Sequence, residues 1–468
     1  MAVAVMCVTA PSCTNVAPAR PQLLFYIDTN TPVVDQLAAH PELSSDATVD
    51  SVHVEVLSDN GDTIEARDIT APDPIDWPVS FGIIPDRGAG QVLHVRVRAY
   101  NSAFVLASDD TTLAASASVI IDRLVDVTST GGGVEARHVV LSGDCFGARP
   151  TFATVAAPKA VTCVDAGNPA GAPTDGVVTV DGTPAATTVG TWALAIEQSC
   201  PGTAPSGTVC IDGGVTFLGD LSLAGYTDGA TQRNSAPLRP VALSPFYLDV
   251  DEFTVGRYRA LVGAGKLAAP PAGSSTTDCT WLGVSDKTHD AFAMNCISRD
   301  LAATACAAVG GKLPTEARWE HAARGRGKRF TYPWGNDEPQ CCSASYGRTA
   351  PNEVRAAMCP GSGPEATASH VAGGGCSGPV DVSSDGVVDL CGGMQEWTSE
   401  IYADYDDPCW GTAIALDTTC TPATGENLVA RGGAWSSPPF LILSAMRFTP
   451  GGLDGADIGF RCAYEASP

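Results

Sequence analysis

The residues with the most evident chemistry are 17 cysteines, spread along the whole chain. None form a CxxC pair, and no cysteine and histidine cluster has the spacing of a zinc site. A cytosolic enzyme seldom carries so many cysteines, so we expect an oxidising compartment and several disulfides. The adjacent Cys341 and Cys342 are expected to enter two different disulfides, and the odd total leaves at least one thiol unpaired.

The histidines give no catalytic pattern. His53, His94 and His138 lie in alternating segments typical of strands, which favours surface strand residues over metal ligands. His321 lies in a predicted helix, where a helix-surface position is favoured over a catalytic base. The sequence also contains no GxSxG motif, no phosphate-binding loop and no glycine-rich dinucleotide motif after a strand. An enzyme class therefore cannot be assigned from generic motifs.

Composition and charge narrow the function classes. The chain has 468 residues, which indicates about two or three domains. It contains 49 glycines and 34 prolines, a composition that favours turns and strands over a helical bundle. The formal charge of -25 argues against binding to nucleic acid or anionic lipid, because both are polyanions.

The start of the chain predicts export. Residues 1–20 include MAVAVMCVTAPSCTN, which is similar to a signal or lipoprotein leader, and Cys13 follows a small residue as a lipid-attached cysteine does. An irregular coil is the alternative. No later run is long and apolar enough to span a membrane, so any attachment would be through lipid at Cys13. We predict an extracytoplasmic protein, either secreted or lipid-anchored in the cell envelope.

Residues 21–145 read as a strand domain. Short runs such as SVHVEVL (51–57) and VLHVRVRAY (92–100) alternate apolar and polar residues, and turns such as Asn60-Gly61-Asp62 separate them. Such alternation predicts an antiparallel, immunoglobulin-like β-sandwich, in which the valines face inward while His53 and Glu55 face outward. No catalytic constellation occurs in this region.

Residues 146–204 are rich in alanine, proline and glycine. The composition predicts a linker, with possible short strands at 177–182 and 191–197. Two cysteine pairs at the borders of this stretch are close enough in sequence to close local loops. They are Cys145 with Cys163 and Cys200 with Cys210.

The C-terminal half carries a series of short motifs. The segment GKLPTEARWEHAARG (311–325) predicts a helix that Thr315 caps and Gly325 ends, and Thr254 is placed to cap an earlier helix. Four further motifs follow in order, namely YPWGN (332–336), DLCGGMQEWT (389–398), RGGAW (431–435) and IGFRC (458–462). Any one of these is compatible with ordinary turn chemistry, but the ordered set is specific.

This set resembles the formylglycine-generating enzyme family, also called the sulfatase-modifying factor domain, over residues 205–465. The resemblance implies a glycine-rich, irregular fold related to C-type lectins, so the whole chain is predicted to be of the α+β class. It also implies a disulfide between Cys306 and Cys462. A bridge across so long a loop stabilises by up to about 5 kcal/mol in the chain-entropy model.

The resemblance further implies a calcium site around the turn that precedes EW. The matching positions are Asp389, Gly392, Met394 and Glu396, which would offer two carboxylates and backbone carbonyls to a hard cation. The alternative is structural: Asp389 would cap a turn and Glu396 would pair with an arginine such as Arg447 or Arg461.

The family's copper site is the point at which this sequence departs from the pattern. The oxidases of the family hold copper(I) with two cysteines, five residues apart, after the RGG turn. Those positions fall near Ser437 and Ile442 when counted forward from the turn, and counting back from GFRC reaches no cysteine either. Serine and isoleucine cannot replace thiolates on copper(I). The iron-dependent relatives use a helical domain with a histidine cluster, which this sequence also lacks.

We therefore predict a non-catalytic binding module for an unknown protein or glycan partner, with calcium as its cofactor and without copper. The alternative is a formylglycine-generating oxidase, or another oxidoreductase of the family, that uses Cys391 and Cys409. Trp319, Trp397 and Trp435 are expected in the core. The candidate binding surface comprises Trp334, Trp410, Phe440, Arg447 and Phe448.

Overall fold

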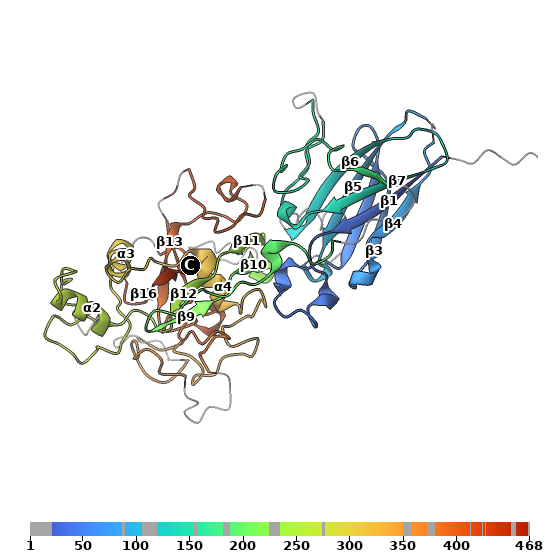
Figure 1. The fold of residues 1–468 in the computed structure, drawn as a ribbon. Helices are drawn as coiled ribbons and strands as arrows, with labels where there is room; N and C mark the ends of the chain where they lie inside the picture. Colours follow the sequence, from blue (N-terminus) through green and yellow to red (C-terminus); the bar gives the residue numbers. More distant parts are fainter. Residues whose placement is uncertain are drawn as a thin grey trace, which may run out of the picture.

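The computed structural model describes residues 21–466, apart from 87–88, 105–118, 154–157, 181–187, 224–234, 274–276, 350–357, 372–379, 412, 424, 426 and 451–454. The predicted leader and Cys13 lie outside the described residues. The described residues form an N-terminal half of long strands and a C-terminal half of short strands, helices and many loops (Figure 1).

The described residues of the N-terminal half form two four-stranded sheets. The first has the order β4-β1-β7-β8, with β4 at Val79–Ile83, β1 at Gln22–Thr29, β7 at Val134–Leu141 and β8 at Val178–Val180. The second has the order β3-β2-β5-β6, with β3 at Thr63–Thr70, β2 at Ser51–Leu57, β5 at Val92–Tyr100 and β6 at Ile121–Thr128. The prediction of purely antiparallel pairing is wrong for one pair, because β1 and β7 run parallel over their whole length.

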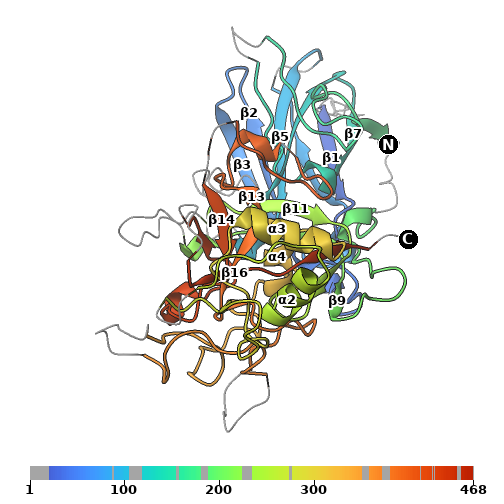
Figure 2. The ribbon, with the colours of Figure 1, turned by 90° about the vertical axis from the view of Figure 1, so that its left-hand side faces the viewer.

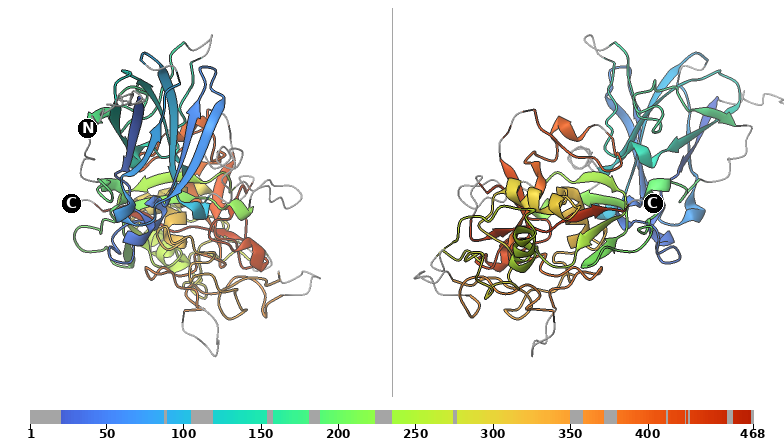
Figure 3. Two further views of the ribbon diagram at one scale, coloured as in Figure 1. Left: turned by 90° about the vertical axis from the view of Figure 1, so that its right-hand side faces the viewer. Right: turned by 60° about the vertical axis from the view of Figure 1, so that its left-hand side comes forward.

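The alternation along the strands places the core correctly. Val52 and Val54 of β2 share one buried cluster with Val95 and Val97 of β5, and the long strands of the two sheets face each other (Figure 3). The outer face differs from the prediction. His53 and Glu55 point away from this core and yet are only 5% and 3% exposed.

Ion pairs explain how the outer face of the second sheet can be buried. The Arg98 guanidinium lies 2.6 Å from a Glu55 carboxylate oxygen, and both side chains are buried. His53 Nδ1 lies 2.7 Å from an Asp68 carboxylate oxygen on the neighbouring strand β3. Buried charges of this kind are tolerated because each has a partner of opposite charge.

Residues 146–204 do not form a free linker. Residues 178–180 pair with β7 as strand β8, and the Cys145–Cys163 and Cys200–Cys210 disulfides close the predicted loops. Trp192 is buried, its ring centroid lies 5.7 Å from that of Phe146, and its indole N–H donates to Asp144. Composition missed this result because a few buried side chains and two disulfides fix a segment that otherwise reads as a coil.

The two halves share a core. Val215 and Phe217 of β10 (Gly214–Leu218), from the C-terminal half, belong to the same buried cluster as the strands of both N-terminal sheets. The Asp46 carboxylate accepts from the Phe217 backbone N–H at 2.7 Å, and the Ser44 hydroxyl accepts from that of Val215 at 3.1 Å. β10 and its partner β11 (Arg239–Leu243) therefore lie where the halves meet (Figure 1).

The C-terminal half is built from short elements. Its helices are α2 (Val255–Gly263), α3 (Arg299–Ala308) and α4 (Glu316–Ala323), which are labelled in Figure 2. Its other strands are β9 (Thr208–Ile211), β12 (Phe246–Asp249), β13 (Gln395–Ile401), β14 (Leu428–Arg431), β15 (Arg447–Phe448), β16 (Ile458–Gly459) and β17 (Ala463–Glu465). They form the sheets β17-β12-β9 and β15-β14-β13-β16.

The predicted helix signals are confirmed. The Thr254 side chain accepts from the Arg257 backbone N–H at the start of α2, and that of Thr315 accepts from Arg318 at the start of α4. Gly325 follows α4 with a φ of 67°, a left-handed conformation that glycine adopts without strain. The core tryptophans are confirmed as well, since Trp319, Trp397 and Trp435 are at most 2% exposed.

Disulfides tie the C-terminal half together. The Cys306–Cys462 bridge implied by the family is present, together with Cys279–Cys296 and Cys341–Cys359. Cys342 is disulfide-bonded too, so the adjacent cysteines do enter different bridges. Among the described residues, no helix is both long and apolar enough to cross a membrane.

Candidate functional site

The RGGAW turn packs against the turn that precedes EW. Gly432 and Gly433 have φ values of 97° and 73°, and a Cβ on Gly432 would lie 2.6 Å from the Leu390 carbonyl oxygen. The Gly392 N–H donates to the Gly432 carbonyl at 3.0 Å, and the Trp435 N–H donates to the Gly393 carbonyl at 2.7 Å. Glycine is needed here because the two turns approach backbone to backbone.

The two positions that match copper ligands carry structural side chains. The Ser437 hydroxyl accepts from the Ala434 backbone N–H at 2.9 Å, which closes the end of the turn. Ile442 is fully buried, and its side chain lies against Gly433. Neither side chain can bind copper(I) as a thiolate does.

The described thiols do not form a replacement pair. Cys391 is the one free cysteine in the described part of the chain, and it is fully buried. Burial raises the pKa of its thiol well above the usual value, so the thiol stays protonated and unreactive. Its sulfur lies 3.9 Å from the Ser444 hydroxyl.

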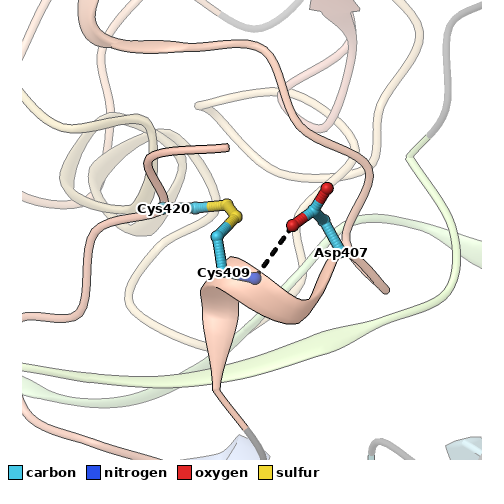
Figure 4. Close-up of side chains that lie close together, drawn as sticks. All are labelled: Asp407, Cys409 and Cys420. Carbon is cyan, nitrogen blue, oxygen red and sulfur yellow. Dashed lines mark hydrogen bonds between the residues drawn. A yellow bond between two sulfur atoms is a disulfide. The ribbon is translucent and has the colours of Figure 1, made fainter. Parts of the chain in front are cut away.

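Cys409, the other candidate thiol, is bonded to Cys420 (Figure 4). The Asp407 carboxylate lies near this bridge and accepts from the Cys409 backbone N–H at 2.8 Å, capping the one-turn helix Pro408–Trp410. These three residues are close enough to suggest a metal site. Because the sulfurs are bonded to each other, they are not available as thiolate ligands.

Glu396 does not fit the predicted calcium set. Both of its carboxylate oxygens accept from the Arg461 guanidinium, at 2.6 to 2.9 Å, and one also accepts from the Trp319 indole N–H at 2.8 Å. All three side chains are completely buried. The structural alternative for Glu396, a pair with Arg461, is therefore what the structure contains.

Asp389 belongs to a group of buried acids with too few cations. One of its oxygens accepts from the Ala368 N–H, and burial raises its pKa to about 6. The pKa values of Glu252 and Asp381 are raised further, first by burial and then by the neighbouring negative charge of Asp389. Both oxygens of Asp381 are buried without a hydrogen-bond partner. Buried carboxyls of this kind are either protonated or neutralised by a cation, so a cation beside Asp389 stays a prediction.

Two further pairs of glutamate and arginine fix α4 to strands β14 and β15. The Arg447 guanidinium contacts both oxygens of Glu316 at 2.5 and 2.9 Å, and Arg431 binds Glu320. All four side chains are buried. These charged residues serve the core and do not face a ligand.

The predicted binding surface is wrong at three positions. Trp410, Arg447 and Phe448 are 3%, 1% and 5% exposed. Arg447 is buried by its ion pair with Glu316, and Phe448 packs in a core cluster as part of strand β15. Trp410 packs with Tyr405, at 5.9 Å between ring centroids.

The other two surface positions differ. Phe440 is 53% exposed on the one-turn helix Pro439–Leu441. This helix follows the RGGAW turn (431–435), after which the family's copper-binding cysteines are missing and which is called the altered turn below. Trp334 is half-buried and stacks on Tyr332 at 5.1 Å between ring centroids. The exposed apolar surface near the altered turn is therefore smaller than the sequence suggested.

His321 is also placed differently from the prediction. It is 1% exposed within α4, and its Nε2 lies 3.0 Å from the Asp212 carbonyl oxygen. Burial lowers its pKa to about 4, which keeps the ring neutral. It is neither a surface residue nor an accessible base.

A cavity that the sequence did not predict opens close to the altered turn. Its volume is about 190 Å³, and its walls come from two loops, 278–292 and 362–364. The Asn295 side chain donates to the carbonyls of Asp278 and Ala456, and the latter also accepts from the Trp435 indole N–H. Sequence patterns missed the cavity because its lining residues occur singly in loops, without a motif.

Comparison with known proteins agrees with the motifs. The model of the sulfatase-modifying factor enzyme 1-like domain matches residues 195–466. An inactive C-alpha-formylglycine-generating enzyme 2 from Mus musculus is 30% identical over 172 residues, covering 34% of this chain and 45% of that protein. A formylglycine-generating enzyme from Streptomyces coelicolor is 26% identical over 302 residues, covering 56% of this chain and 90% of that protein. The chain thus spans under half of the first relative.

Other relatives and structures extend the list. A hercynine oxygenase from Mycobacterium tuberculosis is 26% identical over 153 residues, covering 30% of this chain and 28% of that protein. Among solved structures, PvdO from Pseudomonas aeruginosa is 21% identical with a TM-score of 0.39, covering 55% of this chain and 94% of that one. Treponema denticola variable protein 1 is 16% identical with a TM-score of 0.35, covering 57% of this chain and 98% of that one.

Proposed function

Because the chain belongs to the sulfatase-modifying factor enzyme 1-like family, we propose that its C-terminal half is a non-catalytic binding module that works outside the cytoplasm. The observation that carries the proposal is the pair Ser437 and Ile442 at the copper-ligand positions, one bonded to its own turn and the other buried. An extracytoplasmic location is supported by the disulfides in both halves. A lipid anchor at Cys13 stays a prediction.

The non-catalytic role is further supported by the state of the remaining thiols. A copper(I) oxidase needs two accessible thiolates, whereas Cys391 is buried and protonated and Cys409 is in a disulfide. One curated relative is named an inactive enzyme, while others are named as formylglycine-generating enzymes. The competing proposal is therefore an oxidase of that kind, and the experiment must separate the two.

The test is copper(I) binding to the full chain under competition with a chelator, together with oxygen uptake on a peptide that contains a sulfatase-type cysteine. We expect neither tight binding nor uptake. Tight copper binding with turnover would overturn the proposal and support the oxidase. The full chain is used because the two halves share one core.

A matched variant makes a negative result informative. The double substitution S437C/I442C restores cysteines at the two family positions, and we expect it to gain copper(I) affinity. The control S436C/L441C introduces the same two cysteines one residue earlier in the chain. If both double variants bind copper equally, the positions have been assigned wrongly and the proposal loses its main support.

We also propose that a calcium ion lies beside Asp389, with the carbonyls of Gly392 and Met394 as further ligands. The proposal is supported by the surplus of buried acids, including the unpaired oxygens of Asp381. Calcium would neutralise this charge and so stabilise the fold. Addition of calcium to chelator-treated protein should raise the melting temperature, and D389N should abolish that rise. A melting temperature that calcium leaves unchanged contradicts this proposal.

A further inference from the structure

The cavity near the RGGAW turn (431–435) is lined by a half-exposed carboxylate, Asp278, and by His289, and neither side chain has a hydrogen-bond partner among the described residues. The Asp278 carboxylate has no hydrogen bond or ion pair with any described residue, although the Asp278 carbonyl is held by Asn295. His289 contributes a buried Nδ1 that also has no hydrogen-bond partner. Both side chains line the cavity together with the Phe292 ring, 4.6 Å from the His289 ring between centroids.

The backbone of both loops is fixed in a way that presents this carboxylate. Asp278 has a φ of 58°, a left-handed conformation that is uncommon for a residue with a side chain. The Cys279–Cys296 disulfide and the Asn295 hydrogen bond hold this conformation. Gly363 lies directly beside the carboxylate, because a Cβ there would be only 3.1 Å from the Asp278 Oδ1.

Nearby basic side chains do not neutralise Asp278. Arg259 donates to Asp290 at 2.8 Å and to two backbone carbonyls, and Arg348 pairs with Glu365 at 2.7 Å. Partial burial raises the pKa of Asp278, in keeping with a carboxylate that has no cationic partner. The protein as a whole carries a formal charge of -25, which attracts cations toward such a site.

We propose that this cavity binds an organic cation, a guanidinium or ammonium group, with Asp278 as the charged partner. The inference rests on the proposed binding role and names its ligand class. The carboxylate and the Ser362 hydroxyl can accept from the N–H groups of the cation, while the Phe292 ring offers a cation–π surface. At about 190 Å³ the cavity is smaller than the usual site for a drug-sized molecule and suits one side chain or a small amine.

The test compares two probes that differ only in charge. N-acetyl-arginine amide and its neutral isostere N-acetyl-citrulline amide are titrated into the full chain by calorimetry or ligand-observed NMR at low salt. We expect saturable binding of the arginine probe and none of the citrulline probe. Equal binding of both, or no binding of the arginine probe, would overturn the proposal.

Matched variants locate the site. D278N removes the charge and should weaken binding of the arginine probe by about tenfold or more. The melting temperature should change little, because the carboxylate has no partner within the protein to lose. D62N makes the same change at an exposed turn of the N-terminal half and should bind like the parent. If D278N binds as tightly as the parent, the cation is held elsewhere and the proposal is wrong.

A third measurement identifies the source of the cation. An unstructured decapeptide with a single central arginine should bind more tightly than the amide if the partner is a polypeptide, and no more tightly if the ligand is a free amine. Either result supports a cation site. The copper experiment and this one can be told apart. Copper turnover would refute the non-catalytic role, but it would not change how D278N affects binding of the arginine probe.

Discussion

The two halves of the molecule reach a stable fold by different means. The N-terminal half consists of strands of up to nine residues whose alternating valines pack into one core. Many strands of the C-terminal half have only two to four residues. Its fold depends more heavily on buried pairs of glutamate and arginine, which the N-terminal half also contains, and on a disulfide that connects distant segments. Regular periodicity can therefore be replaced by a small number of specific, long-range interactions.

The largest expected effect comes from the Cys306–Cys462 bridge, which spans 156 residues. The double variant C306A/C462A should lose about 5 kcal/mol of unfolding free energy in the chain-entropy model, against about 3 kcal/mol for the 18-residue Cys145–Cys163 loop of the N-terminal half. Urea unfolding of C306A/C462A and of C145A/C163A measures the two losses. Equal losses would show that the long-range bridge stabilises the protein no more than a local bridge does.

The next effect tests the buried ion pairs. R461M leaves Glu396 charged and buried without its partner, and removes donors to the carbonyls of Val250 and Val388. We expect a loss of about 3–5 kcal/mol in unfolding free energy. The control R67M removes the exposed pair with Glu65 on strand β3 and should cost about 1 kcal/mol or less. A small effect of R461M would mean that Glu396 has another partner, such as a cation.

Asp46, which lies in the contact between the two halves (the seam), predicts how the free energy of unfolding depends on pH. Burial raises the pKa of Asp46 to about 6, from a usual value of 3.8. The folded protein therefore holds this proton more tightly than the unfolded chain, so this group makes the free energy of unfolding fall as pH rises from about 4 to about 6. The total effect of such a shift is about 3 kcal/mol.

The variant D46N should lack this contribution. As pH rises from about 4 to about 6, the unfolding free energy of the parent should therefore fall relative to that of D46N. Chemical unfolding at pH 4, 5, 6 and 7 measures the difference. The exposed control D62N should give a difference that does not change in this way. A constant difference for D46N would show that the seam is hydrated and not a shared core.

The smallest effect is expected at Phe440, on the one-turn helix that follows the RGGAW turn. F440A removes a ring that is 53% exposed and should change the unfolding free energy by about 0.5 kcal/mol or less. F448A removes a buried ring from the core of the same half and should cost about 3–5 kcal/mol. Thermal unfolding of the two variants compares them, and a large loss for F440A would mean that this ring is part of the core.

The sequence by itself determined the local features of both halves. Alternating apolar residues predicted inward-facing valines such as Val52 and Val54, because a strand turns successive side chains to opposite faces. The caps at Thr254 and Thr315 followed from the residues beside each helix. The family motifs predicted the Cys306–Cys462 bridge and the absence of copper-binding thiols at Ser437 and Ile442.

Tertiary structure alone decided which partner each polar residue has. Glu396 binds Arg461 across 65 positions of sequence, and no local pattern distinguishes that partner from a metal ion. Arg447 and Trp410 looked like surface residues because exposure depends on which distant segments cover them. Asp278 and His289 meet at one cavity only because two loops fold together. Contacts between distant segments arise from packing of the whole chain, so they cannot be predicted from the residues next to each position in the sequence.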